Sequence, residues 1–197
     1  MYLKAIAMTI FLILTPFAAF AALMLVAPAA VSLLAGAAIA AATIAYDLYN
    51  GRSIKMLAAG AAIMFGALGA WIALIDGSWS ATEVRLAVDI GTLSIALFSI
   101  AIRRPFTLQY ARETVDAPIQ QAPGFLRANY ILTLAWTGAF VLMLGANLLT
   151  VYLPGLPFWV GLGIGFAARN SALVFTKWYP QYRRMKYPLP ASTMPAA

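Results

Sequence analysis

Long, nearly uninterrupted apolar runs constrain this chain more than any other feature of its sequence. A helix needs about 20 predominantly apolar residues to cross the roughly 30 Å hydrocarbon core of a bilayer. Six segments reach or approach this length, and turn sequences such as Asn50-Gly51 and Pro154-Gly155 separate them. The predicted spans are residues 5–26, 31–49, 56–75, 86–102, 130–152 and 156–176. The sequence therefore predicts an all-α, polytopic membrane protein with six transmembrane helices.

The composition excludes several other classes of protein. Of the 197 residues, 63% are hydrophobic and only 10% are charged, whereas a soluble domain has about 25% charged residues. So few charges cannot cover a water-facing surface, and so many apolar residues exclude a disordered chain. The absence of Cys and His removes disulfides, Cys-based zinc sites and the commonest general base. No phosphate-loop, dinucleotide or nucleophile motif occurs either, so we predict a non-enzymatic protein with no catalytic residue, cofactor or metal site.

The placement of Lys and Arg predicts the orientation of the spans. Of the 13 Lys and Arg residues, 11 fall on the side of the N-terminus, Arg85 falls on the opposite side and Arg169 lies within a span. This asymmetry predicts an even number of crossings with both termini cytoplasmic. It also explains the net charge of +7 without a nucleic-acid partner. We expect one transmembrane domain over residues 1–176, including a cytoplasmic loop at 103–129, and a basic, Pro-rich cytoplasmic tail at 177–197.

The predicted helix at 86–102 carries a stripe of polar and small residues at steps of three and four, which places them on one face. These residues are Arg85, Asp89, Thr92, Ala96, Ser99 and Arg103. One interpretation is a polar wall along the path of a solute or an ion. The other is a seam between helices, where small and hydroxylated residues permit close approach. We favour the seam.

The last predicted span contains an intramembrane arginine. Gly161, Gly165 and Arg169 are spaced by four residues, and Asn170 adds a second polar group. An arginine at this depth costs at least about 2.5 kcal/mol unless it pairs or reaches the interface. Asp47 lies at a compatible depth in the second span, so we predict that it pairs with Arg169. In the alternative interpretation, Arg169 reaches inner-leaflet phosphate and Asp47 is interfacial.

Basic and aromatic residues gather in the cytoplasmic loop and the tail. The loop contains an amphipathic stretch at 107–114, and Phe106 and Tyr110 are placed to enter the membrane interface together. The tail is expected to lie along the membrane and to end without a fold. Contacts with anionic inner-leaflet lipids or with a partner are predicted for Arg103, Arg104, Phe106, Tyr110, Arg112, Trp178, Arg183, Arg184 and Lys186.

One part of the chain resembles a known group of proteins. Asp47 is followed by Asn50-Gly51-Arg52, by a small-residue helix, and by a helix that ends in the run Arg103-Arg104-Pro105-Phe106-Thr107-Leu108-Gln109-Tyr110-Ala111-Arg112-Glu113. Over residues 45–136 this pattern resembles bacterial inner-membrane proteins grouped with intracellular septation protein A. The resemblance implies a polytopic inner-membrane protein in contact with envelope or division machinery. It transfers no catalytic residue.

Two functions fit these features. A structural, assembly or accessory-subunit role explains the small-residue faces, the cytoplasmic loop and the basic aromatic tail. A small-solute or ion transporter or channel explains the polar stripe and Arg169. We favour the assembly role, with a second copy of the chain or another membrane protein as the partner.

Overall fold

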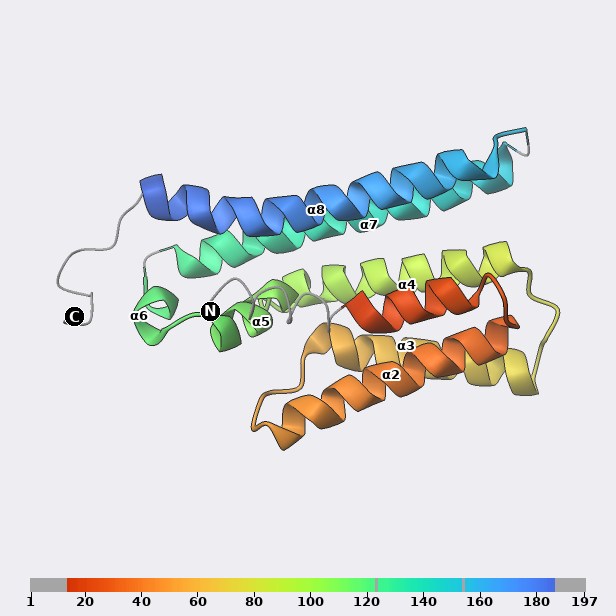
Figure 1. The fold of residues 1–197 in the computed structure, drawn as a ribbon, viewed down its shortest axis with the longest axis horizontal. Coiled ribbons are helices and arrows are strands. Elements are labelled where there is room, and N and C mark those ends of the chain that lie inside the picture. The colour runs from red at the N-terminus through yellow and green to blue at the C-terminus, as the bar shows by residue number, and fades with distance from the viewer. Residues whose placement is uncertain (1–13, 123, 154, 187–197) are drawn as a thin grey trace. The chain divides into compact units, whose positions relative to one another are not determined.

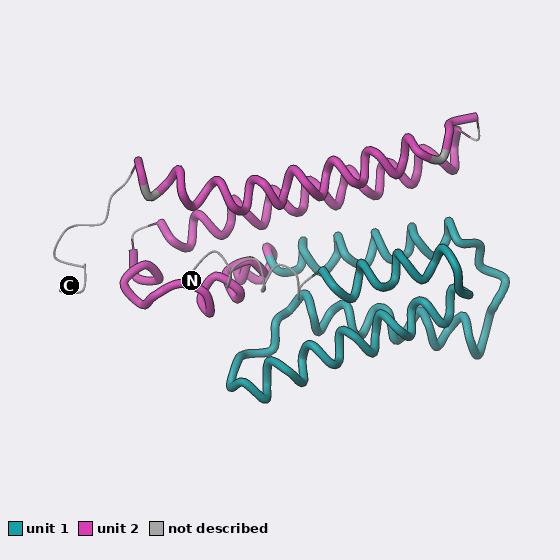
Figure 2. The backbone as a smooth tube through the Cα atoms, viewed as in Figure 1, with its two compact units in different colours: residues 1–99 teal, residues 100–197 magenta. Residues whose placement is uncertain are grey.

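The computed structural model describes residues 14–122, 124–153 and 155–186. These residues form helices joined by turns and short connections, without a strand, which confirms the all-α prediction. The chain divides into unit 1, residues 1–99, and unit 2, residues 100–197 (Figure 2). The boundary falls in the last turn of one helix, two residues before its end.

Four described helices are long and apolar enough to cross a membrane, as expected for a multi-pass membrane protein. They are α2 (Ala29–Tyr49), α3 (Met56–Leu74), α4 (Ala81–Ala101) and α7 (Phe125–Tyr152) (Figure 1). They correspond to the second to fifth predicted spans. The first predicted span is described only from residue 14, as the shorter apolar helix Leu14–Leu23; residues 5–13 lie outside the described part. The sixth overlaps α8 (Phe158–Lys186) from residue 158 onward; α8 contains more polar residues than the other four and is not among the helices apolar enough to count as a span.

The start of α4 corrects the prediction by five residues, because the helix begins at Ala81 rather than at residue 86. A capping box fixes this start: the Ser80 amide donates to the Glu83 carboxylate at 2.7 Å, and the Glu83 amide donates to the Ser80 hydroxyl at 3.3 Å. In the preceding turn, the Asp76 carboxylate accepts hydrogen bonds from the Ser78 hydroxyl and amide at 2.6 and 3.0 Å. These bonds hold the pKa of Asp76 below its ordinary value.

The helices of unit 2 also extend beyond the predicted spans. α7 begins at Phe125 instead of residue 130, after Gly124, whose φ of 84° suits a residue without a side chain. α8 continues past residue 176, through Pro180, and ends at Lys186. The predicted tail therefore starts as a continuation of the last helix. Its remaining residues, 187–197, lie outside the described part.

The core of unit 1 is built around Phe65 of α3, which is fully buried. The rings of Phe17 and Phe20 lie 5.3 and 5.2 Å from the Phe65 ring, centroid to centroid. Gly36 of α2 faces the same ring, and a Cβ there would lie 3.2 Å from it. Since apolar lipid gives no hydrophobic drive for helix association, such close packing is what holds spanning helices together.

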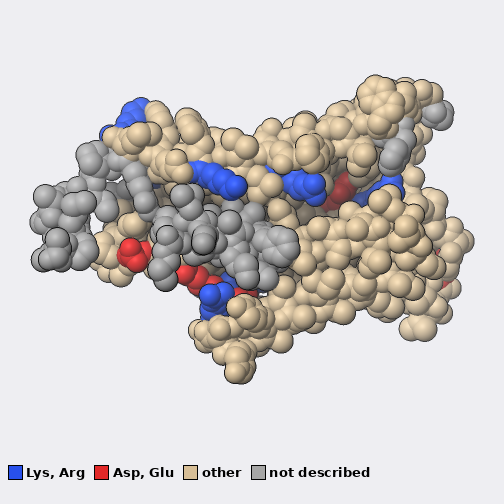
Figure 3. Space-filling view, viewed as in Figure 1, with Lys and Arg blue, Asp and Glu red and all other residues tan. Residues whose placement is uncertain are grey.

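Unit 2 consists mainly of the α7–α8 pair, whose helices run side by side (Figure 1). The Trp136 indole N–H donates to the Thr176 hydroxyl at 3.0 Å, which joins the two helices. The short helices α5 (Phe106–Thr114) and α6 (Ala117–Gln120) precede the pair, and α5 packs on α7. Charged side chains form only a few patches on the face drawn in Figure 3, as the composition requires.

Candidate functional site

The C-terminal half of the predicted polar stripe on α4 is a packed face. Thr92, Ala96 and Ser99 are 6%, 0% and 0% exposed. The Thr92 hydroxyl donates to the Val88 carbonyl, and the Ser99 hydroxyl donates to the Ala96 carbonyl, both at 2.7 Å. Both hydroxyls therefore donate their hydrogen bonds within their own helix. Hydroxyls that are buried and satisfied in this way line a seam rather than a water-filled path.

The N-terminal half of that stripe differs from the prediction. The buried residues one and two turns before Thr92 are Val88 and Val84, which belong to the core of unit 1. Arg85 and Asp89 are only half-buried, and each is engaged in an interaction. At the other end, Arg103 lies beyond the helix, exposed and with a φ of 58°. The six predicted residues therefore do not form one continuous face of α4.

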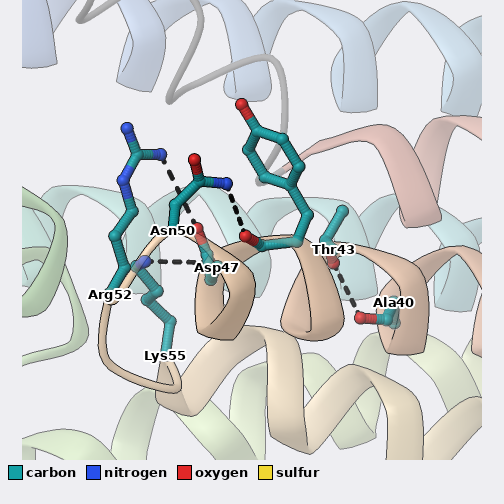
Figure 4. A network of polar contacts seen from close by, with 7 residues as sticks. Ala40, Thr43, Asp47, Asn50, Arg52 and Lys55 are labelled. Carbon is teal, nitrogen blue, oxygen red and sulfur yellow. Dashed lines mark hydrogen bonds and ion pairs between the residues drawn. The ribbon is translucent and has the colours of Figure 1, made fainter.

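The buried charges of unit 1 meet where α2 turns into α3 (Figure 4). The Asp47 carboxylate lies 2.8 Å from the Lys55 ammonium and 3.7 Å from the Arg52 guanidinium. The side chains of Asp47 and Lys55 are 13% and 3% exposed, whereas that of Arg52 is 44% exposed. The Arg52 amide also donates to the Asp47 carbonyl at 2.8 Å, which closes the turn. A buried ion pair thus joins the end of α2 to the start of α3.

The contact of Asp47 with Lys55 is one that the sequence analysis missed. We predicted a partner for Asp47 from depth alone and named Arg169, which belongs to unit 2, whereas within unit 1 Asp47 lies against Lys55. Lys55 was counted only as a boundary charge that sets orientation. The signal that identifies it is an opposite charge eight residues after Asp47, across an Asn-Gly turn. Such a turn brings the end of one helix back to the start of the next.

The glycine pattern of α8 faces α7. A Cβ on Gly161 would lie 2.9 Å from the Thr150 methyl group, and one on Gly165 would lie 3.9 Å from Met143. Ala168 and Ala172 continue this buried face. These small residues of α8 therefore serve the close packing of α7 against α8 within the chain.

Arg169 lies beside that face at the middle of the apolar part of α8. It is ten residues after Trp159 and nine before Trp178, or about 15 and 14 Å along the axis. The two indoles are thus about 28 Å apart, close to the thickness of a hydrocarbon core. Arg169 is half-buried, and its guanidinium lies 6.0 Å from the centroid of the Phe166 ring. The neighbouring Asn170 amide donates to the Phe166 carbonyl at 2.7 Å.

Aromatic residues stack along the last turns of α8. The ring pairs Phe175–Tyr179 and Trp178–Tyr182 are each stacked at 5.1 Å. The Lys186 ammonium lies 5.6 Å from the Tyr182 ring centroid. Trp178 is 51% exposed, as expected for a residue of an interfacial belt.

Arg183 and Arg184 also belong to these last turns of α8. Arg183 donates to the carbonyl of Gly124, before α7. It therefore fastens the end of one helix of the pair to the beginning of the other.

The connection before α7 is only partly as predicted. Arg104 and Arg112 are exposed, and α5 is the expected amphipathic helix. Phe106, however, is 3% exposed and belongs to the protein interior, so it does not enter the lipid interface as expected; Tyr110 is half-buried. Next to Phe106, the Thr107 hydroxyl donates to the Asn129 carbonyl at 2.8 Å, which anchors α5 on α7.

Comparison of the chain with protein-family models, with curated proteins and with solved structures finds no match. In the part of the chain that the structure describes, no group of three or more acidic side chains is gathered in a way that could hold a metal ion. Three polar features therefore remain as candidates for a functional role. They are the buried face of α4 with Thr92, Ala96 and Ser99, which we call the α4 seam, the Asp47–Lys55 pair, and Arg169.

Proposed function

We propose that the protein is a six-span protein of the bacterial inner membrane with both termini in the cytoplasm. Four apolar helices of sufficient length support this topology, as does the 28 Å spacing of the two indoles on α8, which matches a crossing. The distribution of Lys and Arg supports the orientation.

Single cysteines test the topology, because the chain has none of its own. In intact cells, Ser78→Cys should react with a membrane-impermeant thiol reagent, whereas Arg112→Cys should react only after the membrane is opened. Reaction of Arg112→Cys in intact cells would contradict the proposed orientation.

We propose a structural, assembly or accessory-subunit role within that membrane, in contact with anionic inner-leaflet lipids. The observation that carries this proposal is the α4 seam, where Thr92 and Ser99 are buried with their hydroxyls bonded to their own helix. A polar stripe that meets no water offers nothing to a passing solute. The resemblance of the run at 103–113 to the septation protein A group favours a partner in the cell envelope.

The alternative is a small-solute or ion transporter or channel, and the half-buried Asp89 and Arg169 are the observations in its favour. The double variant Thr92→Val, Ser99→Ala separates the two functions. An assembly protein without these hydroxyls should still migrate in a complex larger than the single chain on native electrophoresis of its membranes. A wild-type chain that migrates alone, together with solute flux that the double variant loses, would favour the transporter.

A further inference from the structure

The turn between α2 and α3 contains a chemically labile pair of residues. Asn50 is the only asparagine of the chain that a glycine follows, and asparagine is among the thermolabile residues of proteins. In an Asn-Gly pair, the backbone nitrogen of the glycine attacks the side-chain carbonyl carbon of the asparagine, because glycine has no side chain to hinder the approach. The reaction is deamidation, and it passes through a cyclic succinimide.

Deamidation of Asn50 needs water as its only co-reactant. The Gly51 nitrogen forms a bond to Asn50 Cγ and the Cγ–Nδ2 bond breaks. The proton of the Gly51 amide leaves with the Nδ2 group as ammonia. Water then adds to one of the two carbonyl carbons of the ring and opens it. The product is aspartate or isoaspartate at position 50, which carries one more negative charge than asparagine.

The backbone of the folded turn keeps the attacking nitrogen occupied. The Gly51 amide donates to the Leu48 carbonyl at 3.0 Å, and the Arg52 amide donates to the Asp47 carbonyl at 2.8 Å. These two bonds, with Gly51 at a φ of 68°, form the Schellman motif that ends many helices. The Gly51 amide proton is therefore held in a hydrogen bond and is not free to leave.

The side chain of Asn50 is turned back toward α2 (Figure 4). Its Nδ2 group donates to the Tyr46 carbonyl at 2.7 Å. The ψ of Asn50 is 12°, at which the Gly51 nitrogen eclipses the backbone nitrogen of Asn50 and lies away from its Cβ. Ring closure therefore requires both hydrogen bonds to break and the backbone of the turn to rotate.

The Asp47–Lys55 pair holds the turn in this closed form. The Asp47 carbonyl accepts the last bond of the Schellman motif, and its carboxylate lies 2.8 Å from the Lys55 ammonium. Lys55 is the residue immediately before α3. The pair thus joins the two ends of the turn, and opening the turn separates two buried charges at a large cost.

We infer that Asn50 is a site of spontaneous deamidation, that the closed turn prevents the reaction, and that loss of the Asp47–Lys55 pair allows it. Every contact behind this inference lies within residues 46–55 of unit 1. The modification site is therefore independent of the proposed assembly role, and its failure would leave that role untouched.

Mass spectrometry of the peptide that contains Asn50 tests the inference. The purified full chain is incubated at mildly alkaline pH, either folded in detergent micelles or unfolded in denaturant, and the replacement of the side-chain NH2 by OH is followed over time. Because the reaction needs the open turn, its rate follows the population of that state. We expect the folded wild type to react at least about tenfold more slowly than the unfolded chain. Equal rates, or no reaction in the unfolded chain, would overturn the inference.

Two variants test the role of the ion pair in the folded chain. Lys55→Met removes the pair and should speed the reaction at least about tenfold. Arg52→Ala is the matched control, because it leaves the Asp47–Lys55 contact in place, and its rate should stay within about twofold of the wild type. An equal acceleration in both variants, or none in Lys55→Met, would overturn the inference.

Two further variants separate opening of the turn from global unfolding. The double variant Asp47→Leu, Lys55→Met lacks the pair but strands no charge, so it provides a folded chain even if Lys55→Met does not fold. It should also react faster than the wild type. Ala96→Leu destabilises unit 1 away from the turn, and it should react more slowly than either variant without the pair. The reverse order would show that deamidation follows global unfolding and would overturn the role of the pair.

Discussion

The Asp47–Lys55 pair gives the sharpest prediction about stability. Lys55 is 3% exposed at its side chain and lies 2.8 Å from the Asp47 carboxylate. Removing one partner of a buried pair strands the other charge and typically costs about 3–5 kcal/mol. We expect Asp47→Asn to lower the free energy of unfolding by about 3–5 kcal/mol, because it leaves the buried ammonium of Lys55 without its carboxylate.

Lys55→Met should lower the free energy of unfolding by less, about 3 kcal/mol, because Arg52 remains 3.7 Å from Asp47. Arg52→Ala is the matched control. Its side chain is 44% exposed, and exposed ion pairs contribute about 0–1 kcal/mol. The double variant Asp47→Leu, Lys55→Met removes both charges together. Its free energy of unfolding should be close to that of the wild type, since replacing a buried pair by apolar residues is often neutral.

Reversible unfolding in mixed detergent micelles, followed by far-ultraviolet circular dichroism, measures these free energies. The double-mutant cycle should give a coupling of at least about 1 kcal/mol between the two positions. Strict additivity of the Asp47 and Lys55 substitutions, or a loss in Arg52→Ala as large as that in Lys55→Met, would refute the reasoning.

Three further predictions concern packing and capping. Ala96→Leu should destabilise the protein by about 1–3 kcal/mol in the same unfolding assay because the α4 seam has no room for added bulk, whereas Leu97→Ala, one residue further and exposed, should change stability by about 0.5 kcal/mol or less. Trp136→Phe removes the hydrogen bond to Thr176 and should cost about 1 kcal/mol; an unchanged midpoint would mean that this bond adds nothing. Glu83→Ala removes half of the capping box and should speed amide hydrogen exchange in the first turn of α4 alone; uniformly faster exchange along the helix would argue against local fraying.

The positions of four helices long and apolar enough to cross a membrane followed from the sequence, because apolar length alone dictates which segments can cross a bilayer. The exact ends did not follow, since an apolar window ignores capping. The Ser80–Glu83 box starts α4 among polar residues, and the polar turns after residue 176 continue α8 without an apolar signal.

The candidate site was predicted less completely. Helical periodicity identified Thr92 and Ser99 as members of one face, and this part is confirmed by their burial. Periodicity assumes that the helix continues, however. The predicted face therefore included Arg103, which lies past the end of α4. The contact of Asp47 within unit 1 was missed for a related reason: the prediction compared depths in the membrane, whereas a short turn is what brings two helix ends together. Lys55 lies across such a turn.

The exclusion of water from the α4 seam is the central claim, and the reactivity of a cysteine in place of Ser99 measures it most directly. Ser99→Cys changes the side chain little, and no other cysteine competes. With a small, membrane-permeant thiol reagent, we predict no labelling of Ser99→Cys in native membranes and full labelling after denaturation, while Ser78→Cys in the exposed loop reacts in both conditions. Rapid labelling of Ser99→Cys in the folded protein, at a rate near that of Ser78→Cys, would contradict the assembly role and show a water-filled path along α4.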